Sequence, residues 1–143
     1  MTITVNDVIN AVSGQLAEHF PNMPRYGEEI KQGLNAPCFF IKLLSGSQTR
    51  EVGRRYYRTQ MMDIHYFPNP AKDQNEDAWD MAERLNDILE YIPFGSGVFR
   101  GSRMRGEIVD GVLHFFVNYD FHVMRPKPET PTIQSIKQEV RLK

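Results

Sequence analysis

Residues 37–67 read PCFFIKLLSGSQTREVGRRYYRTQMMDIHYF, and this stretch decides the fold. An apolar run over residues 38–44 is followed by the polar segment Ser45–Thr49 and then by a second β-rich arm that stops at Pro68. Two β-rich arms around a loop containing Gly and Ser predict a hairpin with its turn at Ser45–Thr49. Basic residues gather at the loop end, so we expect a projecting, charged hairpin. Such a hairpin indicates a role in assembly with another chain rather than in catalysis.

The composition is that of a single globular domain. With 143 residues, 41% hydrophobic and 24% charged, the chain can bury a sizeable core. The net charge of −1 argues against a general polyanion binder. No apolar run approaches the ~18 residues of a membrane span, so no membrane contact is expected. Cys38 lies within an apolar run and is interpreted as a small buried hydrophobe, which suits a reducing cytosol.

Charge is distributed unevenly along the sequence. Residues 42–58 hold Lys42, Arg50, Arg54, Arg55 and Arg58 against Glu51 alone. Residues 73–90 hold Asp73, Glu76, Asp77, Asp80, Glu83, Asp87 and Glu90 against Arg84 alone. These segments are either two solvated faces or two complementary surfaces that pair head-to-tail between copies, as in a ring. The second interpretation predicts these interface residues: Arg50, Arg54, Arg55, Arg58, Asp77, Asp80 and Asp87.

Helical periodicity predicts two helices. Apolar residues at helical spacing predict a first helix over residues 5–19, capped by Thr4, and a short extended piece follows near Tyr26–Ile30. Asp73 and Glu76 resemble a capping box at the start of the second helix. Its apolar stripe is Ala78, Met81, Ala82, Leu85, Ile88, Leu89 and Ile92, so we expect it to run to Pro93 and Gly95.

A second hairpin follows, from Val98 to Arg125. Asp110-Gly111 is a strong signal for its turn, because both central residues of a type I′ turn need positive φ. The last arm alternates, and its predicted inward residues are Leu113, Phe115, Val117, Tyr119, Phe121 and Val123. The sequence therefore predicts an α+β domain over residues 1–125. Two helices should pack on one face of a mainly antiparallel sheet, in the order α-β-β-α-β-β.

Residues 126–143 differ in composition from this domain. Three prolines occur within six residues, and the apolar residues beyond them have no core of their own to join. We therefore expect an extended C-terminal tail that docks on another surface. Its predicted anchors are Ile133, Ile136 and Val140.

Chemical motifs are few. Asp63 with His65, and Asp120 with His122, each share one face of a strand, and the two strands are candidates for neighbours. His114 and His122 lie about 25 Å apart along the strand, so they cannot bind the same metal ion. No third ligand is spaced to complete a metal site. Polar cross-strand pairs are the favoured interpretation. We expect no catalytic residue, no cofactor and no metal ion.

The basic arm also has an interpretation as a nucleic-acid surface. It contains Tyr56 and Tyr57 beside its arginines, and arginine with aromatic residues serves both backbone contact and base stacking. The overall negative charge and the acidic second helix argue against this interpretation. A small nucleic-acid-binding domain therefore stays an alternative rather than the favoured function.

The amino-acid sequence resembles that of the tail terminator family of tailed phages and of defective prophages in Gram-positive bacteria. The resemblance covers roughly residues 4–125. It is carried by Val5-Asn6-Asp7-Val8-Ile9-Asn10-Ala11, Pro24–Leu34, Pro37–Ile41, Arg54-Arg55-Tyr56-Tyr57 and Asp63–Phe67. Other head–tail connector or completion proteins of similar size are the alternative.

The resemblance implies a structural, non-enzymatic role. Such proteins form a ring, typically a hexamer, on the head-proximal end of the tail tube, where they stop polymerisation and present a head-joining or collar surface. The implied partners are further copies of the chain, the tail tube protein, the sheath protein of a contractile tail and the head–tail connector. DNA would pass through the ring lumen. The implied location is a virion or a headless, bacteriocin-like particle assembled in the bacterial cytoplasm.

Overall fold

The computed structural model of the chain describes residues 3–27 and 35–125. The elements within them are α1 (Val5–His19), β1 (Arg25–Tyr26), β2 (Cys38–Arg50), β3 (Arg55–Phe67), α2 (Gln74–Ile88), β4 (Tyr91–Phe94), β5 (Gly97–Val109) and β6 (Val112–Met124). The strands form one sheet in the order β1-β2-β3-β6-β5-β4, antiparallel except for the β1–β2 pair. The predicted α+β class, with two helices and a mainly antiparallel sheet, is confirmed.

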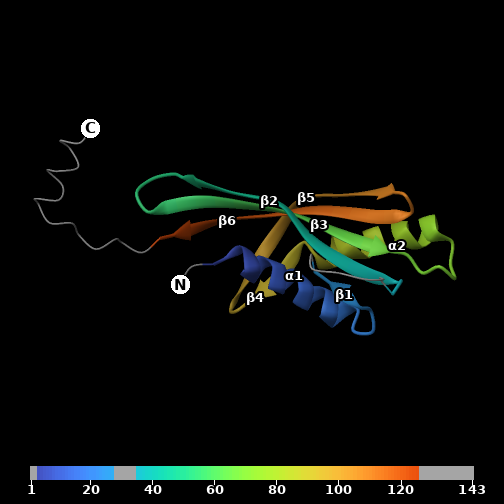
Figure 1. Ribbon diagram of the computed structural model, residues 1–143. Coiled ribbons are helices and arrows are strands. Elements are labelled where there is room, and N and C mark those ends of the chain that lie inside the picture. Colours follow the sequence, from blue (N-terminus) through green and yellow to red (C-terminus); the bar gives the residue numbers. More distant parts are fainter. Residues whose placement is uncertain (1–2, 28–34, 126–143) are drawn as a thin grey trace, which may run out of the picture.

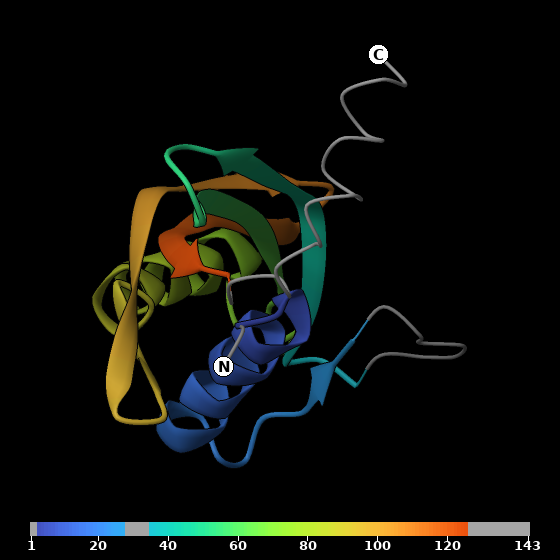
Figure 2. The same ribbon diagram turned by 90° about the vertical axis from the view of Figure 1, so that its left-hand side faces the viewer.

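Both helices contribute to a single core beneath the sheet. Val8, Val12 and Leu16 of α1 and Ala78 and Leu85 of α2 are fully buried in one cluster with the inward residues of the strands. α1 contacts both β2 and β4, which lie towards opposite edges of the sheet. Figures 1 and 2 show the sheet curling around this core, with α1 across its open side.

The first hairpin is confirmed, but its predicted turn is wrong. Residues 45–49 continue β2, and the turn lies at Glu51–Arg54, where Gly53 has φ +60°. A register irregularity between Leu43 and Ser45 marks the point where β2 leaves the core. Beyond it the residues of β2 are exposed, whereas β3 stays paired with β6 on its other side and is partly buried. The polarity of Ser45–Thr49 therefore reflects exposure rather than a loop.

The second helix begins as predicted but ends earlier. Asp73 caps it, its side chain accepting from the backbone N–H groups of Asn75 and Glu76, and Leu89 is the C-cap. Ile92 is fully buried from the short strand β4, not from the helix. An apolar residue at the right spacing fits the inward side of either element, so periodicity alone extended the helix too far. Pro93 is tolerated because β4 is the edge strand.

The second hairpin follows the prediction closely. Asp110 (φ 52°) and Gly111 (φ 78°) form the turn between β5 and β6. Leu113, Phe115, Val117 and Tyr119 are fully buried, as expected. Phe121 is half-buried and packs against the same core. Cys38 is also fully buried, and this burial raises the pKa of its thiol.

Candidate functional site

The tip of the β2–β3 hairpin carries three of the predicted basic interface residues. Arg50, Arg54 and Arg55 are exposed, and we call them the basic tip. The Nε of Arg50 donates to the carbonyl of Gly53 at 2.9 Å. The Nε of Arg55 lies 3.2 Å from Oε1 of Glu51, and its side chain is 54% exposed. An exposed pair of this kind contributes little to stability, so the basic tip is not committed to holding the fold.

Arg58 differs from the basic tip because its side chain turns inward. Its NH1 donates to the carbonyl of Ile3 at 2.7 Å. Its guanidinium carbon lies 6.0 Å from the centroid of the Phe121 ring, in a half-buried position. Arg58 therefore ties the N-terminal segment to the sheet within the chain.

Helix α2 presents an acidic face to solvent. Glu76, Asp80, Glu83 and Asp87 are exposed, and their spacing places them opposite the buried stripe of the helix; we call them the acidic face. Trp79 lies beside them and is 49% exposed. Sequence reasoning did not select Trp79, although a tryptophan outside the apolar stripe was a visible signal. Tryptophan is enriched at the energetic centres of interfaces.

Asp77 is half-buried and has a structural contact of its own. Its Oδ2 accepts from the Tyr66 hydroxyl at 2.7 Å and from the Asn69 backbone N–H at 2.9 Å. Burial and the hydrogen bond to Asp77 raise the pKa of Tyr66. Asp77 therefore fastens the start of α2 to the end of β3.

The basic tip and the acidic face lie at opposite ends of the described domain. Figure 1 shows the β2–β3 turn at one end of the long sheet and α2 at the other. The predicted tail anchors Ile133, Ile136 and Val140 lie outside the described residues. The described interface residues thus do not gather in one place but occupy two separate surfaces.

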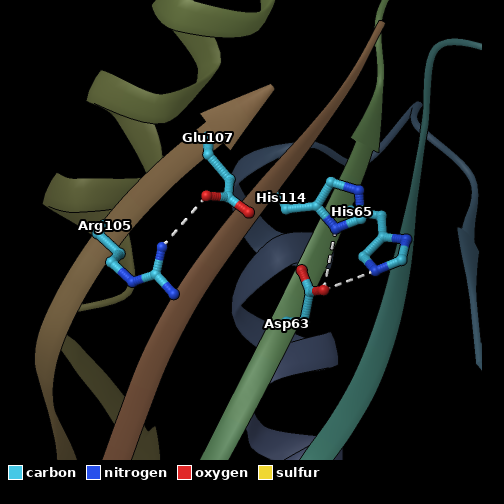
Figure 3. Close-up of polar contacts among 5 residues, drawn as sticks. All are labelled: Asp63, His65, Arg105, Glu107 and His114. Carbon is cyan, nitrogen blue, oxygen red and sulfur yellow. Dashed lines mark hydrogen bonds and ion pairs between the residues drawn. The ribbon is translucent and has the colours of Figure 1, made fainter. Parts of the chain in front are cut away.

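A polar cluster lies on the outer face of the sheet, away from the core. The Nε2 of His65 and the Nδ1 of His114 lie 2.8 Å and 3.0 Å from the same oxygen, Oδ2 of Asp63 (Figure 3). The two imidazole rings are 4.2 Å apart between centroids. Asp63 is almost fully buried, whereas both histidines are part-exposed.

The two histidines control the ionisation of Asp63. Burial by itself raises the pKa of this carboxyl group, but the hydrogen bonds from His65 and His114 outweigh it, and the pKa is lowered overall. Arg105 and Glu107 lie beside the cluster on β5, where NH1 of Arg105 is 3.4 Å from Oε2 of Glu107 (Figure 3). The guanidinium carbon of Arg105 also lies 4.2 Å from the centroid of the Phe116 ring.

The two strands that were candidates for neighbours, β3 and β6, do pair, but the register places His65 directly opposite His114 rather than near His122. His122 instead lies 3.2 Å from Glu51 near the hairpin tip. His114 supplies the third metal-binding side chain that the sequence analysis did not find. Its spacing from Asp63 along the chain gives no signal, because only the β3–β6 register brings them together.

Comparison with known protein families gives a match over most of the sequence. A family model described as phage tail terminator protein matches residues 7–131. No curated protein matches the chain. One solved structure, of a protein without a descriptive name, aligns at a TM-score of 0.43 and 12% identity over 90% of this chain and 100% of that chain, and this likeness carries no argument. Within residues 3–27 and 35–125, no helix has the length and apolarity needed to cross a membrane.

Proposed function

Because the chain belongs to the phage tail terminator family, a family of structural tail proteins, we propose that it forms a hexameric ring on the head-proximal end of the tail tube. The match over residues 7–131 is the observation that carries this proposal. In this role the ring ends polymerisation of the tube, and of the sheath in a contractile tail. Its other side meets the head connector or collar.

The placement of charge supports a head-to-tail contact between copies. The basic tip and the acidic face have opposite sign and lie at opposite ends of the domain (Figure 1). A surface that pairs with a different surface of the next copy forms a heterologous interface, which closes into a ring when the rotation between copies allows. The exposed ring of Trp79 beside the acidic face suits the centre of such an interface.

The C-terminal tail is proposed as a second contact between copies. The backbone N–H of Arg125 donates to the carbonyl of Arg54 at 2.9 Å, so the last described residue lies at the basic-tip end of the domain. That end is far from the chain's own α2, which favours a neighbouring copy as the surface on which Ile133, Ile136 and Val140 dock.

The experiment reverses the charge of the basic tip. The Arg54→Glu and Arg55→Glu double variant should fold normally by circular dichroism but fail to complete tails, because like charges across an interface cost several kcal/mol. The matched control is Arg100→Glu with Arg103→Glu, which makes the same charge change at exposed positions of β5. Tails are counted and measured by electron microscopy after complementation of a deletion strain. Normal tails from the Arg54/Arg55 variant would contradict the proposed contact.

A charge swap tests the partner surface. Asp80→Lys with Asp87→Lys places positive charge on the acidic face, and alone it should also block assembly. Combined in one chain with the reversed tip, it should restore tails, since every contact in the ring then has opposite charges again. If tails are not restored although both variants fold, the basic tip and the acidic face do not contact each other. The terminator role itself would then still be tested by the length of the tails.

A further inference from the structure

Three side chains with metal-binding atoms meet where β3 pairs with β6. The ligand atoms of Asp63, His65 and His114 all lie within 4.8 Å of one another. Two imidazole nitrogens and one carboxylate oxygen are a donor set used in three-ligand zinc sites. His65 and His114 are Cα partners in the ladder, so backbone hydrogen bonds hold both in position before any ion arrives.

One atom of this cluster lacks a partner among the described residues. Oδ2 of Asp63 takes both histidine contacts, whereas Oδ1 is buried with no hydrogen-bond partner. A buried carboxylate oxygen without a partner is costly. The histidine side chains are 19% and 23% exposed, against 6% for Asp63, so solvent reaches the cluster past the imidazoles.

We propose that Asp63, His65 and His114 bind one divalent transition-metal ion, for which zinc is the best match, with water completing its coordination. Mixed imidazole and carboxylate donors suit zinc, whereas magnesium and calcium prefer oxygen ligands alone. Tetrahedral ligands with metal bonds of about 2.0–2.1 Å lie about 3.3 Å apart. The two nitrogens are already 2.8 Å and 3.0 Å from Oδ2, so small side-chain rotations suffice.

Binding requires a rearrangement of protons but no net release when both imidazoles are neutral. Without the ion, each imidazole donates to Asp63 Oδ2 from the nitrogen that faces it. With the ion, that nitrogen becomes the ligand and the other ring nitrogen carries the single proton. Exchange with solvent permits this because both rings are part-exposed.

The ion would brace the centre of the sheet. β3 belongs to the first hairpin and β6 to the second, and their pairing is the only direct strand pairing between these hairpins in the described part of the chain. A ligand that binds only the folded state stabilises it in proportion to its concentration over Kd. The ion is therefore expected to raise the melting temperature of the domain, independently of any ring.

The experiment titrates the full chain, freed of metal by chelation, with Zn²⁺ in a calorimeter. We expect one ion per chain, a rise in melting temperature, and no such effects with Mg²⁺. Asp63→Asn and His114→Gln should each weaken binding more than the about 10–100-fold loss that follows removal of an outer-shell partner. The matched control is His122→Gln. His122 lies on β6 like His114, but its imidazole is near Glu51 at 3.2 Å, so its loss should leave binding unchanged.

Circular dichroism in chelator verifies that each variant is folded before titration. Should His114→Gln fail to fold, His65→Gln supplies the same test from the opposite strand. With Co²⁺ as a probe, a visible absorption band that is present in the parent chain and absent in Asp63→Asn supports the site. The proposal is overturned if the parent chain binds no Zn²⁺. It is equally overturned if Asp63→Asn and His114→Gln bind as well as the parent, or if His122→Gln loses as much affinity as they do.

Discussion

Gly101 offers a sharp test of the packing around the curled sheet. A methyl group on this residue would lie 2.7 Å from the Leu89 carbonyl oxygen, 2.8 Å from Val117 Cγ2 and 3.3 Å from Tyr119 Cε1. The Leu89 oxygen cannot easily retreat, because it accepts a hydrogen bond of 2.7 Å from the Tyr119 hydroxyl. The backbone N–H of Gly101 is itself bonded to the Glu90 carbonyl. The added methyl therefore meets backbone and core from two sides.

The expected cost of Gly101→Ala follows from these contacts. Overpacking a filled core costs about 1–3 kcal/mol. Weakening one buried hydrogen bond at the Leu89 carbonyl adds about 0.5–1.5 kcal/mol. We therefore expect the free energy of unfolding to fall by about 1.5–4.5 kcal/mol.

Gly14→Ala is the matched control. Gly14 lies exposed in the middle of α1, and apart from its chain neighbours and the nearby backbone of its own helix, a methyl group there would meet no described atom within 4 Å. The same substitution should raise stability by about 0.5–1 kcal/mol, since alanine loses less backbone entropy on forming a helix. Urea unfolding followed by circular dichroism measures both. A loss below about 1 kcal/mol at Gly101, the lower limit for overpacking, would refute the close approach of β5 to the Leu89 carbonyl.

Three further predictions concern the core, the pH dependence and the tail. Phe115→Ala should lower the free energy of unfolding by about 3–5 kcal/mol, and a loss below about 1 kcal/mol in urea unfolding would place this side chain outside the core. Burial raises the pKa of Asp63, but the histidine hydrogen bonds lower it overall. The stability from this carboxylate is thus present above the unfolded pKa of about 3.9 and lost as pH falls through the folded pKa. Asp63→Asn should flatten the decline in stability below about pH 4, and an unchanged slope would contradict this. Truncation after Arg125 should spare the melting temperature and impair assembly, so an unfolded or fully assembling truncated chain would refute the docking role.

Local signals in the sequence were sufficient for the first helix, for the start of the second and for one turn. The bounds of α1 and the start of α2 follow from a capping residue and an apolar stripe. The Asp110-Gly111 turn follows from the need for positive φ. Each of these features depends on residues within a few positions of one another, which is why a single sequence carries them.

Features that depend on distant pairing were not predictable. The turn of the first hairpin was misplaced because the second half of β2 is exposed on both faces, so Ser45–Thr49 has the composition of a loop. His114 was missed because a strand register is a relation between distant segments, and a shift of one residue turns every side chain to the other face. The candidate interface, by contrast, was visible as charge along the chain, although Trp79 and the inward contacts of Arg58 and Asp77 needed the structure.

The inward contacts decide which of the predicted interface residues can test assembly cleanly. Arg50, Arg54 and Arg55 are exposed at the turn end of the hairpin, so reversing their charge should act on a partner rather than on the fold. Arg58 and Asp77 are different, because each charged group also holds a backbone segment: Arg58 binds the Ile3 carbonyl, and Asp77 binds the Asn69 N–H. Removing one partner of a part-buried charged hydrogen bond costs about 1.5–3 kcal/mol, enough to lower the amount of folded protein in a cell. Loss of tails in an Arg58 or Asp77 variant would therefore not distinguish a broken interface from a weakened domain, whereas the basic tip and the acidic face separate the two.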